Sequence, residues 1–465
     1  MIPLSIAKLA EITQGKINNV ANPDEIIEQM PEIDSRKIDA NHFFVALVGE
    51  HLDGHDYVDS AIAAGAKLAF VSRAVNAPSI LVDDVTQALA EIATYVRGQL
   101  SGLKVIAITG SQGKTTTKDL AAHILQSAGE TVANVGSLNN DLGVPLTLLR
   151  CKTSTRFCIV EMGARHRGDI ARLMKIAQPN IGVALVVGTA HVGEFGSQAE
   201  IAKAKSEIIT GLDSGATAIL GTYDEFTPHM ADGLNLKVLV FGEGSGCDVR
   251  AADQEFREGR AHFDLVTPQG RAAVGLQLLG MHQIANALAA ATIALSLDVP
   301  LETIAAALST AQPASKWRMA LIEESGLLLI NDSYNANPES MAAALRTLAL
   351  LAQERGGESW AILGKMQELG ASSTALHKQI GKLASDIGID HLVSVGTQEY
   401  LLAEEDQALV EHYFDKNEKA LEIVQHLSQG DVVLVKASRS EGFEKLASAI
   451  IESWRDMREV ESAAK

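Results

Sequence analysis

Short apolar runs alternate along the chain with longer segments in which apolar residues recur at helical spacing. Residues 105–109 form one such run, which predicts a buried strand, and a glycine-containing turn follows it. Beyond the turn, Leu120, Ile124, Leu125 and Ala128 fall on one face of a helix that Gly129 can end. The pattern therefore predicts a strand, a tight loop and a helix in direct succession.

The same alternation extends over most of the chain and predicts an α/β fold. From residue 103 to about residue 314, predicted strands alternate with predicted helices, as in a mostly parallel sheet wrapped by helices. Further strands are expected at 43–49, 157–161 and 181–187. Three later runs, at 327–331, 360–364 and 432–435, predict another α/β unit of Rossmann-like type.

Punctuation in the sequence divides this pattern into three domains. Asp84 can cap a helix that is followed by Ser101 and Gly102, and residues 313–318 read as a second linker. We expect a smaller N-terminal α/β domain at 1–100, a central P-loop domain at 101–314 and a C-terminal domain at 315–465.

Composition narrows the functional classes. The 465 residues are 47% apolar and only 4% aromatic, and the formal net charge of −19 argues against a nonspecific nucleic-acid or anionic-membrane surface. Three cysteines without metal spacing favour a reduced, cytoplasmic chain. The first residues resemble an amphipathic helix rather than a signal sequence, and we expect no membrane segment.

The turn after residue 109 has the chemistry of a phosphate cradle. Gly110 and Gly113 let backbone N–H groups point inward, Lys114 supplies a cation, and Thr115 offers a hydroxyl to Mg²⁺. Position 108 is isoleucine, so the motif is the short Gly-x-x-Gly-Lys-Thr form. We expect ATP to bind here, through residues Gly110, Ser111, Gln112, Gly113, Lys114, Thr115 and Thr116.

Other polar residues stand where predicted strands end. Because ligands collect at the carboxyl ends of parallel strands, Glu161 and His191 are expected to reach the magnesium and the γ-phosphate. Asn139 and Asn140 either donate amides to a substrate or only form a turn. Lys205, 14 residues after His191, lies in a helical segment whose simplest interpretation is a solvated face.

Two more stretches carry polar groups of this kind. His282 and Asn286 are expected on one face of an alanine-rich helix, where the amide of Asn286 can contact adenine. The run 327–331 ends in the dense polar loop 332–338. In the N-terminal part, Arg36 and the turn at 53–55 are compatible with a site for a ligand's phosphate and sugar, and equally with a surface ion pair and a plain turn.

Taken together, these stretches resemble the Mur ligase family over nearly the whole chain. Two of them, Asn139-Asn-Asp-Leu-Gly-Val-Pro145 and Asp332-Ser-Tyr-Asn-Ala-Asn-Pro338, point to the family member that uses D-alanyl-D-alanine. The other matching stretches are 109–118, 161–164, 190–191, 202–207, 280–287, 368–370 and 436–440.

The resemblance implies a three-domain, ATP- and Mg²⁺-dependent amide ligase of peptidoglycan precursor synthesis. Its substrates would be UDP-N-acetylmuramoyl-tripeptide and D-alanyl-D-alanine, and the enzyme would act as a cytoplasmic monomer. ATP would phosphorylate the tripeptide carboxylate, and the amine of the dipeptide would attack the resulting acyl phosphate.

The resemblance also assigns roles to single residues. Lys114 would neutralise charge on the β- and γ-phosphates, and Thr115 would bind a first Mg²⁺. Glu161 and His191 would bind a second Mg²⁺. Lys205 matches a lysine that related ligases carry as a carbamate, which is an oxygen ligand for the metal. Further roles are implied for adenine contact (Asn286), ribose contact (Asp332), the nucleotide loop (Asn335, Asn337), the phosphates on domain closure (Arg318) and substrate binding (Ser35, Arg36, Asn139, Asn140, Lys436, Arg439).

Two positions depart from the family pattern, and two other interpretations stay open. Lys365 stands where an aspartate is usual, which weakens the assignment of the dipeptide pocket, and Ser137 stands where asparagine is common. Folylpolyglutamate synthase shares the P-loop and the residues Glu161, His191 and Lys205, although the N-terminal stretch argues against it. A nucleotide-binding protein that has lost catalysis is the alternative from another class.

Overall fold

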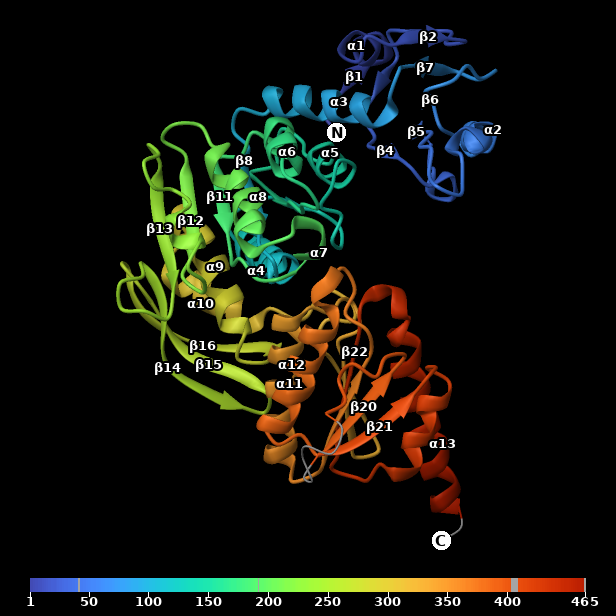
Figure 1. Ribbon diagram of the computed structural model, residues 1–465. Helices are drawn as coiled ribbons and strands as arrows, with labels where there is room; N and C mark the ends of the chain where they lie inside the picture. The colour runs from blue at the N-terminus through green and yellow to red at the C-terminus, as the bar shows by residue number, and fades with distance from the viewer. Residues whose placement is uncertain (41, 191, 403–408, 464–465) are drawn as a thin grey trace.

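The computed structural model describes residues 1–40, 42–190, 192–402 and 409–463. It contains three large sheets and a two-stranded sheet, with helices packed on their faces, so the predicted α/β class is confirmed. Figure 1 shows the N-terminal sheet at one end of the molecule, the C-terminal sheet at the other and the P-loop unit between them. No helix in the described ranges is both long and apolar enough to cross a membrane.

The N-terminal unit is built on a five-stranded sheet in the order β2-β7-β6-β5-β4, parallel except for the β2–β7 pair. A two-stranded antiparallel sheet, β1-β3, lies beside it. The elements are β1 Leu4–Ser5, α1 Ile6–Ile12, β2 Lys16–Asn18, β3 Ile26–Ile27, β4 Pro31–Glu32, η1 Ser35–Lys37, β5 Phe43–Val45, η2 Gly54–Tyr57, α2 Val58–Ala63, β6 Leu68–Val71, β7 Ser79–Leu81 and α3 Val85–Gln99.

Helix α3 joins this unit to the next one. Asp84 caps it as predicted, because the carboxylate accepts from the backbone N–H groups of Thr86 and Gln87. The helix packs on α1 on one side and on α5 and α6 on the other. One apolar core therefore runs from the N-terminal sheet into the central unit, through buried residues such as Ile92 and Val96.

The central unit is a nine-stranded sheet in the order β16-β15-β14-β13-β12-β11-β8-β10-β9. It is parallel from β9 to β14 and antiparallel over the last three strands. Its elements are β8 Lys104–Thr109, α4 Lys114–Gln126, β9 Thr131–Ala133, α5 Gly143–Leu148, β10 Phe157–Glu161, α6 Asp169–Ala177, β11 Ile181–Ala184, α7 Val192–Phe195, α8 Gln198–Thr210, β12 Thr217–Gly221, η3 Thr227–His229, β13 Lys237–Gly242, β14 Val249–Arg257, β15 Arg260–Thr267, β16 Gly270–Leu279, α9 Gln283–Ser296 and α10 Leu301–Thr310.

The C-terminal unit is a six-stranded sheet in the order β17-β18-β22-β19-β20-β21, parallel except for the edge strand β17. Separate apolar cores cover its two faces, one under α11 and α12 and one under α13 and η5. The elements are β17 Ala320–Glu324, β18 Leu327–Asn331, α11 Pro338–Arg355, β19 Ser359–Leu363, η4 Gly370–Ser372, α12 Ser373–Asp386, β20 His391–Val395, β21 Val410–Phe414, η5 Lys419–His426, β22 Val432–Lys436, η6 Arg439–Glu441 and α13 Phe443–Ala463.

The central and C-terminal units meet through small, specific contacts. The turn between β14 and β15 lies on α11, where a Cβ added to Gly259 would come 2.7 Å from Leu351. Gly193 and Gly370 approach so closely that a Cβ on Gly193 would lie 2.6 Å from the backbone nitrogen of Gly370. Glycine at both positions therefore permits contact between the two backbones.

Two predicted strands are shorter than expected. The run 43–49 contains only β5, Phe43–Val45, and the run 181–187 contains only β11, Ile181–Ala184. After Ala184 the chain leaves the sheet and pairs with the P-loop, since Ser111 N donates to the carbonyl oxygen of Val186 at 2.8 Å. The helix α4 ends at Gln126, and Ser127 rather than Gly129 is its C-cap.

Candidate active site

The predicted phosphate loop joins β8 to α4. Gly113 has φ of +82° and caps α4, and a Cβ at this position would lie 2.3 Å from Asn286 Oδ1. Both the left-handed backbone and the close neighbour therefore require glycine. Lys114 Nζ donates to the Gly110 carbonyl oxygen at 2.7 Å, which folds the lysine over its own loop.

Glu161 lies beside this loop because β10 and β8 are parallel neighbours whose carboxyl ends coincide. Its side chain is buried, with 1% exposure. Thr115 Oγ1 donates to Glu161 Oε2 at 2.8 Å, and Asn139 Nδ2 donates to Oε1 at 2.8 Å. The carboxylate is thus held in place by one donor on each oxygen.

Lys205 is on α8, and it is 4% exposed rather than on a solvated helix face. Burial, followed by the positive charge of Lys114, lowers the pKa of Lys205 well below the ordinary lysine value. Within the described residues, Lys205 Nζ has no hydrogen bond and no ion pair. The site therefore favours a neutral amine at this position. His191, the other predicted metal ligand, lies outside the described residues.

Asn286 faces the loop from α9. Its Nδ2 donates to Gln283 Oε1 at 2.8 Å, and Thr117 Oγ1 donates weakly to its Oδ1 at 3.4 Å. His282 precedes the helix instead of sharing a face with Asn286 within it. Burial, partly opposed by Asp332, lowers the pKa of His282 to about 4, so the imidazole is neutral at pH 7.

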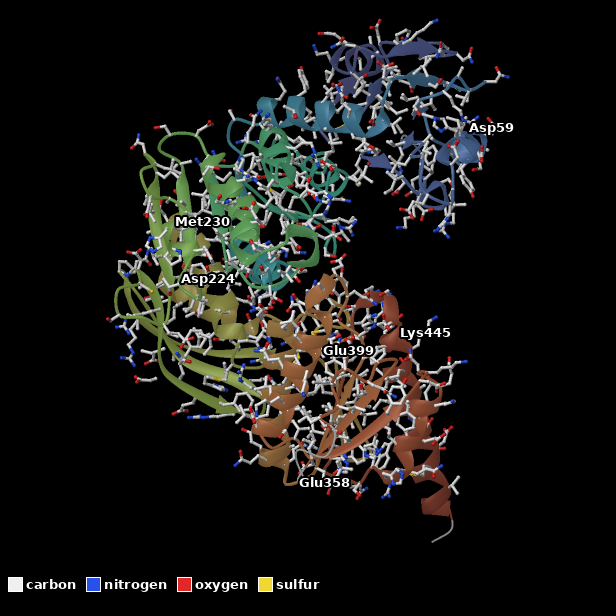
Figure 2. The ribbon with its side chains drawn as sticks, in the orientation of Figure 1. Asp59, Asp224, Met230, Glu358, Glu399 and Lys445 are labelled. Carbon is white, nitrogen blue, oxygen red and sulfur yellow. The ribbon has the colours of Figure 1, made fainter. Side chains whose placement is uncertain are left out.

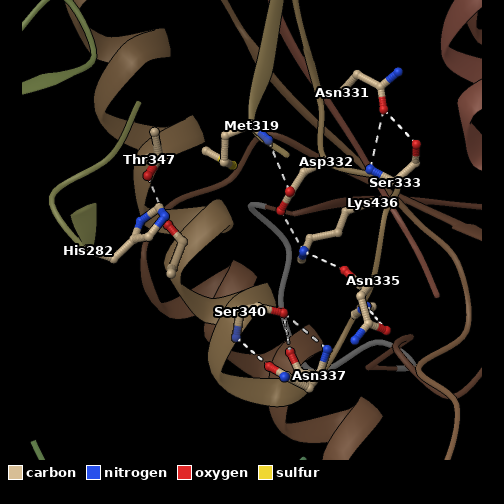
Figure 3. A network of polar contacts seen from close by, with 12 residues as sticks. His282, Met319, Asn331, Asp332, Ser333, Asn335, Asn337, Ser340, Thr347 and Lys436 are labelled. Atoms are coloured by element: carbon tan, nitrogen blue, oxygen red, sulfur yellow. Dashed lines mark hydrogen bonds and ion pairs between the residues drawn. The ribbon is translucent and has the colours of Figure 1, made fainter. Parts of the chain in front are cut away.

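The polar loop after β18 meets the end of β22, its parallel neighbour (Figure 3). Lys436, only 1% exposed, donates to Asp332 Oδ2 at 2.5 Å and to the Asn335 carbonyl oxygen at 2.9 Å. The other oxygen of Asp332 accepts from Met319 N at 3.0 Å. Asn337 caps α11 in a reciprocal pair with Ser340. These polar side chains therefore form hydrogen bonds with other residues of the C-terminal unit.

Arg318, at the end of the linker 313–318, contacts the phosphate loop. Its Nη2 donates to Thr115 Oγ1 at 3.0 Å, and its guanidinium lies 4.2 Å above the Tyr334 ring. The hydroxyl of Tyr334 in turn contacts Ser137 Oγ. Arg318 and Tyr334 therefore connect the C-terminal unit to two loops of the central unit.

A cavity of about 1360 Å³ lies between the central and C-terminal units and gathers most of the predicted residues. Gly110, Ser35, Arg36 and Arg439 are not among the lining residues. The predicted residues that line it are Ser111, Gln112, Gly113, Lys114, Thr115, Thr116, Asn139, Asn140, Glu161, Lys205, Asn286, Arg318, Asp332, Asn335, Asn337 and Lys436.

The remaining substrate candidates make local contacts. Arg36 is exposed and pairs with Asp34 at 2.9 Å, which lowers the pKa of Asp34 to about 2. Asn140 Oδ1 accepts from the backbone N–H groups of Leu142 and Gly143, so it does form the turn. Arg439 pairs with Glu444 at 2.7 Å and lies over the Trp317 ring.

The structure describes the surroundings of both residues that depart from the family pattern, Lys365 and Ser137. Lys365 is exposed, and its carbonyl oxygen accepts from Ser438 N at 3.2 Å. Ser137 reaches the hydroxyl of Tyr334 across the cavity between the units. Among the described residues, the Lys365 side chain has no ion pair, and nothing in the structure explains a lysine at this position.

Lys118 was missed by sequence reasoning, although it is in the stretch that defines the P-loop. It is 3% exposed and pairs with Asp119 at 2.9 Å. Its Nζ donates to the carbonyl oxygens of Asn134 at 2.9 Å and Gly136 at 3.1 Å. Asn134 Oδ1 accepts from Glu161 N, so the lysine supports the loop that leads to Asn139. Its position one turn after Lys114, on the buried helix face, was the available signal.

Replacing Lys118 with methionine is expected to loosen residues 134–137 without unfolding the protein. Two carbonyl groups would lose a charged donor, which lowers the free energy of local opening by about 2 kcal/mol, or about 30-fold in amide exchange rate. Hydrogen exchange of a peptide covering these residues measures this. Lys104→Met, at an exposed lysine of β8, is the control, and equal exchange in both variants would contradict the expectation.

Family profiles match the chain in three successive segments. The Mur ligase family catalytic domain matches residues 29–97, the Mur ligase middle domain matches 108–294, and the Mur ligase glutamate ligase domain matches 317–439. The matched segments include the phosphate loop and the polar loop after β18.

Curated relatives are similar over almost the full length. The UDP-N-acetylmuramoyl-tripeptide–D-alanyl-D-alanine ligase of Mycobacterium tuberculosis is 39% identical over 500 residues, covering 97% of this chain and 98% of the relative. The enzyme of the same name from Escherichia coli is 36% identical, covering 97% and 99%.

Solved structures give the same picture. MurF from Acinetobacter baumannii superposes with a TM-score of 0.88 at 36% identity, covering 97% of this chain and 99% of that one. MurF ligase from Thermotoga maritima in complex with ADP has a TM-score of 0.80 at 28% identity, covering 93% and 99%. FPGS from L. casei, at 14% identity and a TM-score of 0.57, shares the fold alone.

Proposed function

The chain belongs to the Mur ligase family, and we propose that it joins D-alanyl-D-alanine to UDP-N-acetylmuramoyl-tripeptide in an ATP-dependent reaction that makes a peptidoglycan precursor. The relatives that it matches over nearly their whole length are named for this activity. One observation carries the proposal: the phosphate loop and the polar edge of the C-terminal sheet face each other across a single cavity.

The chemistry needs both sides of that cavity. A carboxylate is a poor acyl donor, so its terminal oxygen first attacks the γ-phosphorus of ATP, which gives an acyl phosphate and ADP. The neutral amine of D-alanyl-D-alanine then attacks the acyl carbon, and inorganic phosphate leaves. Holding the two substrates and ATP together replaces a collision of three molecules with reaction inside one complex.

Lys114 and Arg318 bind the phosphates in this proposal. The backbone N–H groups at the start of α4 and the Lys114 ammonium surround the β- and γ-phosphates. Arg318 Nη2 donates to Thr115 Oγ1 at 3.0 Å, and this contact with the phosphate loop supports a role for its guanidinium in neutralising the charge that develops during phosphoryl transfer.

The residues present fit a magnesium site. Mg²⁺ prefers oxygen ligands in octahedral geometry, in which neighbouring ligand atoms lie about 3 Å apart. Thr115 Oγ1 and Glu161 Oε2 are both oxygen ligands and lie 2.8 Å apart, and Thr115 is proposed to hold a first Mg²⁺ and Glu161, with His191, a second. A bound Mg²⁺ would reduce the repulsion between the γ-phosphate and the attacking carboxylate. His191 and Lys205 as a carbamate complete the proposed ligand set.

The nucleoside is proposed to lie toward the C-terminal unit. Asn286 lines the cavity and offers its amide to adenine. Asp332 contacts the ribose by accepting a further hydrogen bond, since a carboxylate has about four lone-pair sites and two are used here. Asn335 and Asn337 line the same part of the cavity, although the Asn337 side chain also caps α11.

The remaining substrate contacts are proposed from the family resemblance. Ser35 and Arg36 belong to the N-terminal unit, where the UDP-sugar is expected to bind. Asn139 and Asn140 face the tripeptide, and Lys436 and Arg439 face the peptide or the transition state. From the same resemblance we also propose that the reaction takes place in the cytoplasm and that the protein acts as a monomer.

Phosphate release tests this function. The protein is incubated with ATP, Mg²⁺ and UDP-N-acetylmuramoyl-tripeptide, with and without D-alanyl-D-alanine, and Lys114→Ala is the blank. Release that needs both substrates is the expected result. Activity with a folate and glutamate instead would replace this proposal with folylpolyglutamate synthase, and no release with any pair would favour a silent nucleotide-binding protein.

A further inference from the structure

Three successive backbone N–H groups after β11 each donate to a side chain from a different element. Val187 N donates to Asp224 Oδ2 at 2.8 Å, and Asp224, which is labelled in Figure 2, lies in the loop after β12. Gly188 N donates to Ser111 Oγ at 2.8 Å, in the phosphate loop. Thr189 N donates to Glu339 Oε1 at 2.6 Å. Of these acceptors, only Glu339 comes from the C-terminal unit.

Glu339 makes several close contacts with residues 188 and 189. Its Oε1 also accepts from Thr189 Oγ1 at 2.9 Å, so one oxygen binds both donors of that residue. A Cβ added to Gly188 would lie 2.7 Å from the same oxygen, which means that the carboxylate rests directly against the loop backbone. Its other oxygen, Oε2, is buried and has no hydrogen-bond partner among the described residues.

Glu339 is held by a well-capped helix start. It stands in the first turn of α11, where Asn337 and Ser340 form a reciprocal cap (Figure 3). A carboxylate at this end of a helix is also favoured by the helix dipole. The two hydrogen bonds from Thr189 to Glu339 therefore tie the position of Thr189 to the position of the C-terminal unit.

We propose that Glu339 is a positioning residue, through which the C-terminal unit fixes residues 187–189 in the geometry needed for phosphoryl transfer. Val187 and Gly188 of this segment line the cavity together with Ser111, and Glu339 lines the same cavity. The kinetic part of the proposal rests on the proposed ligase function. Its structural part, ordering of the segment by Glu339, does not.

Four variants separate positioning from other roles. Glu339→Ala removes the acceptor, whereas Glu339→Gln keeps an oxygen that can accept from Thr189, removes the charge and replaces Oε2, which has no partner among the described residues, with an amide nitrogen. Thr189→Val removes one of the two donors. Glu354→Ala is the matched control, because Glu354 is on the same helix and accepts from Gly259 N of the central unit at 3.2 Å.

Hydrogen exchange and steady-state kinetics are measured on all four full-length proteins. In Glu339→Ala, a peptide containing Gly188 and Thr189 is expected to exchange about tenfold faster, and kcat to fall about tenfold with KM values within about twofold. Thr189→Val gives a smaller change of the same kind. Glu339→Gln and Glu354→Ala remain near the wild type in both measurements.

Three outcomes would overturn the proposal. Unchanged exchange in Glu339→Ala removes the positioning role. Faster exchange throughout the protein with unchanged kcat indicates stability alone, and a Gln variant as inactive as the Ala variant indicates that the charge acts directly on a ligand. If the wild type lacks ligase activity while the exchange pattern is as expected, the proposed function fails and the ordering of the loop stands.

Discussion

Replacing Lys114 with alanine is expected to lower ATP-dependent phosphate release by about a thousandfold or more. Burial lowers the pKa of this ammonium group, and the nearby Glu161 carboxylate opposes that effect. Phosphate oxygens in the loop would oppose it further, so the lysine is charged when nucleotide is bound. The alanine variant would leave that charge on the phosphates uncompensated.

Steady-state phosphate release and nucleotide-dependent thermal shift both measure this effect. The variant should lose most of the stabilisation by nucleotide, because a ligand that binds the folded state stabilises it by an amount that grows with the logarithm of the ligand concentration divided by Kd. Lys104→Ala, an exposed lysine at the start of β8, should behave like the wild type. A Lys114→Ala protein with activity within tenfold of wild type would remove the lysine from the proposed mechanism.

Replacing Lys205 with alanine is expected to cause a loss of similar size, about a thousandfold in kcat. Lys205 is buried beside Lys114, and these surroundings favour its neutral amine. A neutral amine is the form that adds to CO₂, and the resulting carbamate turns a cation into an oxygen ligand. Formate or acetate added in solution should therefore restore part of the activity of the alanine variant, by placing a carboxylate in the vacated space.

Lys203→Ala is the matched control, since Lys203 is an exposed residue of the same helix that pairs with Glu200 at 2.6 Å. It should retain full activity and show no response to formate. Labelled bicarbonate and carbon NMR can detect the carbamate in the wild type directly. Full activity of Lys205→Ala, or a loss of activity with neither rescue nor a carbamate signal, would contradict the carbamate role.

Local patterns were sufficient to predict the phosphate loop and the polar strand ends. A buried strand that stops at a carboxylate or at a polar loop is visible in the sequence, as at Glu161 and Asp332. Parallel neighbours bring such ends together, so the general location of the cavity followed from the alternation of strands and helices. The loop glycines and Lys114 were visible because their chemistry needs fixed spacing.

Long-range pairing was not accessible in this way. Lys436 binds Asp332 because β22 lies beside β18, and nothing near either residue indicates that neighbour. Residues 185–187 have the composition of a strand, yet they leave the sheet because Ser111 and Asp224 bind their backbone from other loops. Lys118 is similar, since a lysine is usually exposed and only its three partners allow it to be buried.

The junction between the N-terminal and central units and the junction between the central and C-terminal units differ in how easily water can enter them. The N-terminal junction is one continuous apolar core through α3, and opening it would expose that core to solvent. The C-terminal junction has a smaller apolar part, where Leu279 and Phe256 pack in the C-terminal core, and it adds hydrogen bonds at Thr189 and Thr115 and a backbone contact at Gly193 and Gly370, which water can replace at low cost. Substrate entry and product exit should therefore occur by hydration of the C-terminal junction, while the N-terminal junction stays dry through the catalytic cycle.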